Sequence, residues 1–151
     1  MQSFELVEIL YVEDNVHDAE LTIPALKDGG LANKLLWLRD GQQALDYMFQ
    51  QGEYAERGND WPRLVLLDLK MPRLDGIEVL QAIRADDRTR MVPVVIMTSS
   101  QEESDIVRSY DLGVNSYVVK PVDFAALTQF AHHAGYHWIA INRAPDFGNG
   151  E

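Results

Sequence analysis

The sequence predicts a doubly wound α/β domain, in which a five-stranded parallel sheet is flanked by helices. The length of 151 residues fits one domain, and 46% hydrophobic and 25% charged residues are ordinary values for a globular protein. Five short apolar runs lack the polar alternation of a half-exposed strand, so they suit strands covered on both faces. Segments with helical spacing alternate with these runs, which favours the α/β class.

The predicted strands are short and rich in leucine or β-branched residues. They lie at residues 7–12, 35–38, 64–67, 92–98 and 117–119, of which 35–38 is the least regular. A polar stretch at 50–62 contains Gly52 and Gly58, and we expect a long loop there before the third strand.

Apolar spacing and capping residues mark the predicted helices. Apolar residues recur at three-residue intervals over 77–83, directly after Asp75-Gly76. Ser100 has a glutamate three residues later, the pattern of a capping box, so we expect a helix to begin there. Pro24 lies inside the first helical pattern and predicts a kink or a shorter helix, because an interior proline costs roughly 3 kcal/mol.

The last predicted helix carries more apolar surface than one packing face needs. Its main stripe steps by three and four residues and consists of Phe124, Leu127, Ala131, Ala134, Trp138 and Ile141. We expect this stripe to pack on the sheet. A second face with Phe130, His133 and His137 then forms a dimer or partner surface, or is a set of scattered surface aromatics. The two histidines have no acidic third ligand, so zinc is not expected there.

Composition and the termini exclude several classes of protein. The formal net charge of -11 argues against a nucleic acid or an anionic membrane as the main partner. With no cysteine, disulfides and thiolate chemistry are excluded. Neither a signal peptide nor an apolar run of the roughly 20 residues that span a bilayer is present, so a cytoplasmic protein is expected. We expect one domain over 1–143, a flexible tail over 144–151 and no output domain.

Polar side chains follow four of the predicted strands at the point where each strand ends. They are Glu13-Asp14, Asp68, Thr98-Ser99-Ser100 and Lys120-Pro121. Because ligands of an open α/β sheet collect beyond the carboxyl ends of its strands, we expect these groups to lie together. Three carboxylates in one place repel one another and suit Mg²⁺, which binds one or two carboxylates together with phosphate and water. The combination, rather than any one residue, predicts the site.

These residues resemble the motifs of the receiver domain of two-component response regulators. The resemblance is carried by Glu13-Asp14, Asp68 within LVLLDLKMPRLDG, Thr98 and Lys120-Pro121, and it covers nearly the whole chain. It implies a flavodoxin-like fold with strand order 2-1-3-4-5. It also implies a signalling protein that catalyses only its own phosphorylation and dephosphorylation, with a histidine kinase as its partner.

The resemblance also implies a role for each residue of the site. Asp68 is the expected phosphoacceptor. Mg²⁺ or Mn²⁺ is expected to bind Asp14 and Asp68 directly, Glu13 largely through water, and the backbone carbonyl of Lys70. Charge neutralisation and alignment are what a weak carboxylate nucleophile needs for attack on phosphorus. A cis peptide bond is expected before Pro121.

Further residues of the motif imply switching and timing. Thr98 and Lys120 are expected to hold the phosphoryl oxygens. Since the Thr98 hydroxyl can donate to a phosphoryl oxygen only when one is present, it binds the two states of the site differently. Tyr117 resembles the aromatic switch of the family, and otherwise is a plain buried tyrosine. Lys70 and Ser100 occupy the positions that tune phosphate lifetime in the family.

The long loop before residue 64, the missing output domain and the segment WIAINRAP together resemble a narrower group. Small regulators paired with bacterial phytochrome histidine kinases share this layout. The alternatives are an intermediate phosphate carrier in a multistep phosphorelay and an unphosphorylated binding module. A phosphatase with an aspartyl-phosphate intermediate needs a second aspartate where Lys70 stands. A flavodoxin-like cofactor site is disfavoured because Glu13-Asp14 would repel a phosphate.

Overall fold

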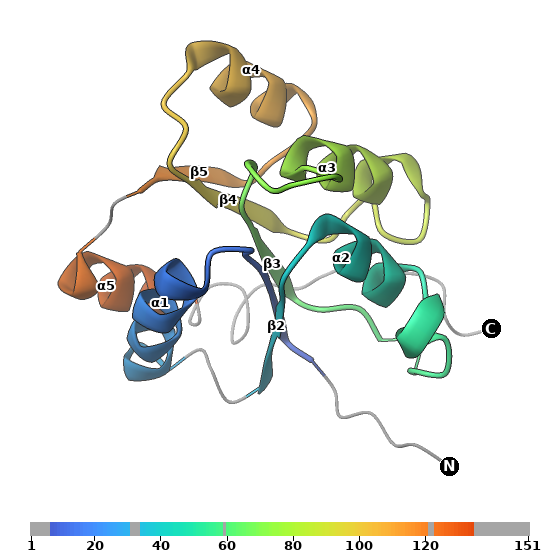
Figure 1. Ribbon diagram of the computed structural model, residues 1–151, viewed down its shortest axis with the longest axis horizontal. Coiled ribbons are helices and arrows are strands. Elements are labelled where there is room, and N and C mark those ends of the chain that lie inside the picture. The colour runs from blue at the N-terminus through green and yellow to red at the C-terminus, as the bar shows by residue number, and fades with distance from the viewer. Residues whose placement is uncertain (1–6, 31–33, 59, 121–122, 135–151) are drawn as a thin grey trace.

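The computed structural model describes residues 7–30, 34–58, 60–120 and 123–134, and it contains a five-stranded parallel sheet (Figure 1). The strands are β1 (Ile9–Val12), β2 (Leu35–Leu38), β3 (Leu64–Leu67), β4 (Val94–Thr98) and β5 (Ser116–Val119). Their order across the sheet is β2-β1-β3-β4-β5, which confirms the predicted fold class and strand order. All neighbouring strands are parallel, so their carboxyl ends lie along one edge.

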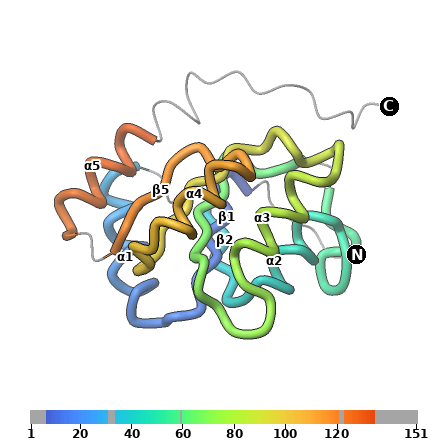
Figure 2. Tube along the Cα trace, turned by 90° about the horizontal axis from the view of Figure 1, so that it is seen from above, coloured from blue at the N-terminus to red at the C-terminus, as the bar shows by residue number. Residues whose placement is uncertain are grey.

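Helices cover both faces of this sheet. They are α1 (Val16–Asp28), α2 (Gly41–Met48), α3 (Gly76–Ala85), α4 (Glu103–Asp111) and α5 (Phe124–Ala134), with a short 3₁₀ turn, η2 (Gly52–Tyr54). Helices α1 and α5 lie together on one face, α2 and α3 on the other, and α4 contacts the edge strand β5 (Figure 2). Among the described residues, no helix combines the length and the apolar character needed to cross a membrane.

The sheet has a hydrophobic core on each face. In β1, Leu10 and Val12 pack with residues of α2 and α3, whereas Ile9 and Tyr11 pack with residues of α1 and α5. All four are almost completely buried. Because successive side chains of a strand point to opposite faces, a strand between two helical layers must be apolar at every position. This explains the uninterrupted apolar runs of the sequence.

Helix α1 continues through Pro24, so the predicted shortening does not occur. Its cap is Asn15, whose side chain accepts a hydrogen bond from the backbone N–H of Asp18 at 2.9 Å. Both Pro24 and Glu20, the residue four positions earlier, are exposed. The carbonyl that loses its helical partner therefore lies on the solvent side, where water can bind it.

The stretch 50–62 is more ordered than the predicted long loop. It contains η2, and both Arg57 and Trp61 are buried. The Arg57 guanidinium donates to four backbone carbonyls, those of Tyr47, Met48, Gly58 and Asp60. Glycine and charge in this stretch correctly indicated irregular backbone. They did not reveal that one arginine closes it against the end of α2, because that contact depends on tertiary packing.

Two details of the later helices differ from the sequence predictions. Helix α4 begins at Glu103 with Glu102 as its cap, and the expected capping box at Ser100 does not form because the Ser100 hydroxyl bonds to Asp105 instead. In α5, Leu127, Ala131 and Ala134 are buried as predicted. Phe124 is 54% exposed and does not belong to the buried stripe, since the first turn of α5 lies beyond the core. Trp138 and Ile141 lie outside the described residues.

Candidate functional site

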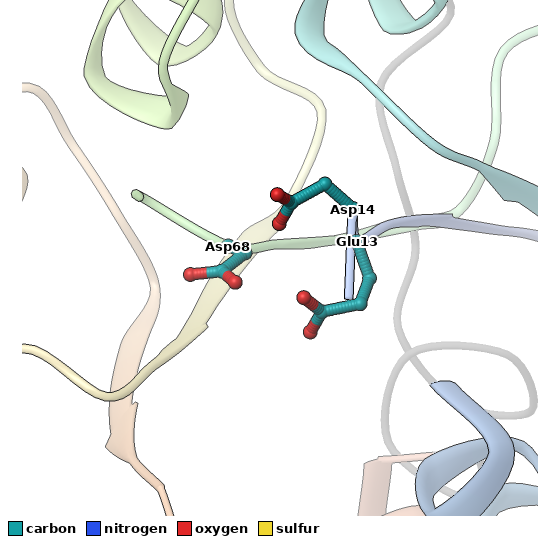
Figure 3. A group of neighbouring side chains, drawn as sticks. All are labelled: Glu13, Asp14 and Asp68. Carbon is teal, nitrogen blue, oxygen red and sulfur yellow. The ribbon is translucent and has the colours of Figure 1, made fainter. Parts of the chain in front are cut away.

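Three carboxylates meet at the carboxyl edge of the sheet. Oxygen atoms of Glu13, Asp14 and Asp68 all lie within 4.8 Å of one another (Figure 3). Glu13 and Asp68 are buried at 1% and 6% exposure, while Asp14 is half-buried. Carboxylates this close and this poorly hydrated repel one another, and a bound cation would relieve that repulsion, so the cluster has the chemistry of a cation site.

The register of two strands brings these residues together. Val12 of β1 pairs with Leu67 of β3, so the residues that follow each strand lie side by side. The loop after β1 is held in place from two directions. The Trp37 indole donates to the Glu13 carbonyl at 2.9 Å, and the Asn15 backbone N–H donates to the Glu13 carboxylate at 3.2 Å.

A glycine shapes the other side of the site. Gly76 begins α3 and packs directly against the backbone of Asp68 and Leu69, where any added Cβ would collide with the Asp68 carbonyl. The backbone N–H of Gly76 donates to the Leu69 carbonyl at 2.9 Å. This close approach is the physical reason for glycine in the D-L-K-M-P-R-L-D-G segment.

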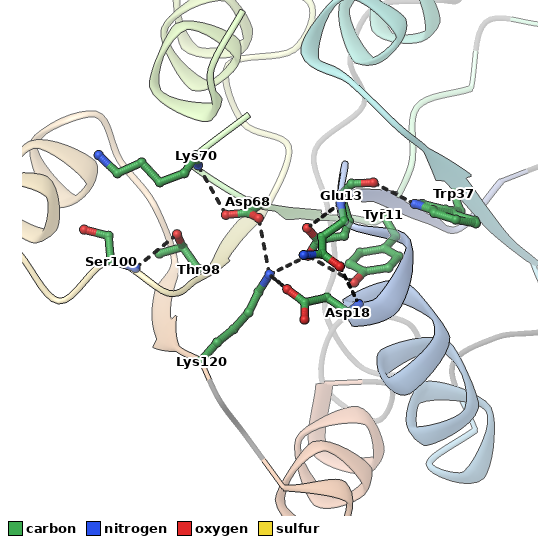
Figure 4. Close-up of polar contacts among 10 residues, drawn as sticks. Tyr11, Glu13, Asp18, Trp37, Asp68, Lys70, Thr98, Ser100 and Lys120 are labelled. Atoms are coloured by element: carbon green, nitrogen blue, oxygen red, sulfur yellow. Dashed lines mark hydrogen bonds and ion pairs between the residues drawn. The ribbon is translucent and has the colours of Figure 1, made fainter. Parts of the chain in front are cut away.

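Lys120 lies among the carboxylates (Figure 4). Its Nζ is 2.6 Å from Glu13 Oε1, 2.9 Å from Asp18 Oδ2 and 3.2 Å from Asp68 Oδ2. The lysine side chain is only 13% exposed. One ammonium therefore offsets part of the negative charge of the cluster and reaches the Asp68 carboxylate directly.

Burial and charge shift the pKa values of this cluster. Burial raises the pKa of Glu13 to about 7, and the neighbouring Asp68 carboxylate acts in the same direction against the opposing effect of Lys120. Burial alone would lower the pKa of Lys120, but its hydrogen bonds to Glu13 and Asp18 outweigh burial and raise it. Burial also raises the pKa of Tyr11, whose hydroxyl donates to Glu13 Oε1 at 3.4 Å.

Thr98, the last residue of β4, and Ser100 in the loop after it also lie near Asp68 (Figure 4). Thr98 is fully buried, and its hydroxyl oxygen accepts a hydrogen bond from the Ser100 backbone N–H at 3.3 Å. The Tyr117 hydroxyl donates to the Ser100 carbonyl at 3.1 Å, which ties β5 to this loop. From the loop after β3, the backbone N–H of Lys70 donates to Asp68 Oδ1 at 3.3 Å.

The donor set fits a small divalent cation. Carboxylate oxygens are the ligands that Mg²⁺ and Mn²⁺ prefer, and three converge from the loops after two adjacent strands. Within the described residues, no histidine belongs to this cluster, which distinguishes it from a typical zinc site.

The structure brings together most of the predicted site residues and adds four that the sequence reasoning missed. The missed residues are Tyr11, Asp18, Trp37 and Asp105. Of these four residues, Asp18 could have been predicted from the sequence. It lies four residues after Asp14, in the first turn of a helix that begins at the site. The other three act across elements and leave no local pattern.

Of the residues predicted for an interface, the structure describes Phe130 and His133, and neither belongs to the site. Phe130 is partly buried against the core beside α1, and His133 is exposed on α5. Pro121 and His137 lie outside the described residues. The expected cis peptide bond before Pro121 and the expected place of His137 on the second face of the last helix therefore stay predictions.

Comparison with known proteins identifies the class. A family model of the response regulator receiver domain matches residues 9–132, and the chain belongs to this family. The sequence is 41% identical to the probable methanogenesis regulatory protein FilR2 of Methanothrix harundinacea, over 91% of this chain and 86% of that protein. It is 37% identical to the response regulator Rcp1 of Synechocystis, over 91% of this chain and 92% of that protein.

Several similar solved structures are response regulators of phytochromes. The bacteriophytochrome response regulator AtBRR is 50% identical, with a TM-score of 0.74 over 92% of this chain and 99% of that chain. The Mn²⁺-bound form of Rcp1 is 36% identical, with a TM-score of 0.78 over 91% of this chain and 98% of that chain. The predicted cofactor, Mg²⁺ or Mn²⁺, agrees with this metal-bound neighbour and with the three-carboxylate cluster.

Proposed function

We propose that this chain is a cytoplasmic signalling receiver in which Asp68 accepts a phosphoryl group from a phytochrome-type histidine kinase. The observation that carries this proposal is the position of the Asp68 carboxylate, which lies beside the Glu13 and Asp14 carboxylates and contacts the Lys120 ammonium. A carboxylate is a weak nucleophile, so alignment and nearby positive charge are what its attack on phosphorus needs.

Each neighbour of Asp68 has a role in this proposal. Asp14, Asp68 and the Lys70 carbonyl would hold the divalent cation, with Glu13 acting largely through water. The bound cation supplies charge neutralisation for the incoming phosphoryl oxygens. Lys120 keeps its proton and contacts Asp68 Oδ2, so it is placed to pair with one phosphoryl oxygen.

Thr98 and Tyr117 would convert phosphorylation into a change of shape. The Thr98 oxygen accepts from the Ser100 N–H, which leaves its hydroxyl proton free to donate to a phosphoryl oxygen. Such a bond pulls on the loop to which the Tyr117 hydroxyl is attached. The face formed by β5 and α5, with Phe130 and His133, is our proposed contact with a second copy or a partner.

Intact-mass measurement after incubation with acetyl phosphate tests this function. We expect a gain of one phosphoryl group that requires Mg²⁺ and disappears in Asp68→Ala. Asp87→Ala is the matched control, because the Asp87 side chain is fully exposed and pairs with the exposed Arg90. Size-exclusion chromatography of the same samples reports whether phosphorylation changes the oligomeric state.

An acyl phosphate that still forms in Asp68→Ala would show that Asp68 is not the phosphoacceptor. If folded protein gains no mass from acetyl phosphate or from a cognate kinase, the chain is an unphosphorylated binding module and the proposal fails.

A further inference from the structure

A carboxylate of α4 joins the two loops that flank Asp68. Asp105 Oδ2 lies 3.1 Å from Lys70 Nζ and accepts a hydrogen bond from the Ser100 hydroxyl at 2.6 Å. Lys70 lies two residues after Asp68, and Ser100 lies two residues after Thr98. One oxygen atom therefore bridges both positions that stand beside the proposed phosphoryl site.

Within its own helix Asp105 interacts with the charge of Arg108, but this does not account for its two contacts outside the helix. The cap of α4 is Glu102, which makes no side-chain capping bond. Glu103, in the same first turn, is exposed and could interact with the helix dipole equally well. What separates Asp105 from Glu103 is its contact with Lys70 and Ser100.

The ion pair also decides where the Lys70 side chain points. Figure 4 shows this side chain running away from Asp68, toward the side where Ser100 lies. The side chain is 57% exposed and its stem is flexible, so packing does not hold it there. Its backbone N–H is 3.3 Å from Asp68 Oδ1, which leaves the Asp68 carboxylate within reach of the freed side chain.

We propose that Asp105 is a positioning residue that holds the Lys70 ammonium away from Asp68 and thereby keeps the phosphoryl group short-lived. This inference rests on the proposed function. Hydrolysis forms a bond from a water oxygen to phosphorus and breaks the bond from phosphorus to the Asp68 oxygen. The products are the free carboxylate, inorganic phosphate and a proton.

A freed Lys70 would oppose this reaction. The attacking water must approach phosphorus from the side opposite the Asp68 oxygen, and in this proposal a freed Lys70 ammonium reaches that side. An ammonium that pairs with phosphoryl oxygens there occupies the path of the water and stabilises the phosphorylated state. Asp105 competes for the same ammonium, so its charge favours hydrolysis without touching the reacting atoms.

The test measures the half-life of the acyl phosphate after acetyl phosphate is removed. We expect Asp105→Asn to prolong it about threefold, the size of effect expected from one exposed ion pair. Asparagine keeps an amide oxygen that can accept the Ser100 hydroxyl bond, so the change isolates the charge that holds Lys70. Glu103→Gln removes a first-turn charge of the same helix without that contact, and we expect an unchanged half-life.

A double mutant separates positioning from other roles. In the Lys70→Met background, adding Asp105→Asn should leave the half-life unchanged, because the ammonium on which Asp105 acts is gone. If Asp105→Asn still prolongs the half-life in that background, Asp105 acts directly on water or through α4, and the inference is wrong. An unchanged or shorter half-life in Asp105→Asn alone also overturns it. Failure of the unsubstituted protein to gain a phosphoryl group would instead overturn the proposed function.

Discussion

Two cations with little solvent exposure, Lys120 and Arg57, are held by different kinds of partner. Lys120 lies among three carboxylates, those of Glu13, Asp18 and Asp68. Arg57, at 6% exposure, donates instead to backbone carbonyls and stacks on the Tyr47 ring, 4.4 Å from its centroid. Burial lowers the pKa of Arg57, whereas hydrogen bonds to carboxylates raise that of Lys120 against the effect of burial.

This difference separates two kinds of site. Arg57 and the carbonyls that it binds form a structural clamp, whereas the surroundings of Lys120 can change. Carbonyl groups neither titrate nor accept a phosphoryl group, so the charge around Arg57 stays constant while the chain is folded. The carboxylates around Lys120 can be protonated, neutralised by a divalent cation or phosphorylated. The interactions of Lys120 therefore change with the state of the site, which is the condition for a signal to alter the structure.

The largest expected effect comes from removing the clamp. Arg57→Met removes a buried cation that donates to four carbonyls at the end of α2 and in the following loop, two of which keep Trp61 and Gln50 as second donors. The free energy of unfolding should fall by roughly 3 kcal/mol. Urea unfolding followed by circular dichroism measures it. Arg90→Met, which removes an exposed arginine paired with Asp87, is the control and should change stability by less than about 0.5 kcal/mol. Equal losses in both variants would mean that the carbonyl clamp is unimportant.

The second prediction tests whether the Lys120 cluster responds to metal where the clamp does not. Lys120→Met leaves Glu13 and Asp68 without their cation, and we expect a loss of about 2 kcal/mol of unfolding free energy in EDTA. Saturating Mg²⁺ should recover most of this loss, with a larger gain than in the unsubstituted protein. The loss in Arg57→Met should not be recovered. If Mg²⁺ stabilises both variants equally, the distinction between the two sites fails.

The smallest effect is the pH dependence of the metal-free protein. The pKa of Glu13 is about 7 when folded and near its ordinary value of 4.5 when unfolded, so the folded state binds more protons between these values. This contribution to stability is complete below pH 4.5 and is lost as pH rises through 7. Raising pH from about 6 to 8 in EDTA should therefore lower the unfolding free energy by about 1 kcal/mol more than in Glu13→Gln. The same slope in both proteins would contradict the assignment to Glu13.

The acidic site could be predicted from the sequence because it depends on local features. Each strand is a short apolar run, and Glu13, Asp14 and Asp68 directly follow such runs. Parallel strands end at one edge, so Glu13-Asp14 and the distant Asp68 could be expected at one place. The predicted capping box at Ser100 was wrong because the pattern is local, whereas the Ser100 hydroxyl bonds to Asp105 instead.

The sequence by itself determined the class of sheet, the position of the strands and the set of acids at their ends, because these follow from the period of apolar residues along the chain. Only the tertiary structure decided which carboxylates accept hydrogen bonds from the Lys120 ammonium. Lys120 meets its three carboxylates across sequence separations of 107, 102 and 52 residues. Such contacts depend on how α1 and β5 pack against the central strands, and no spacing within either segment records that geometry.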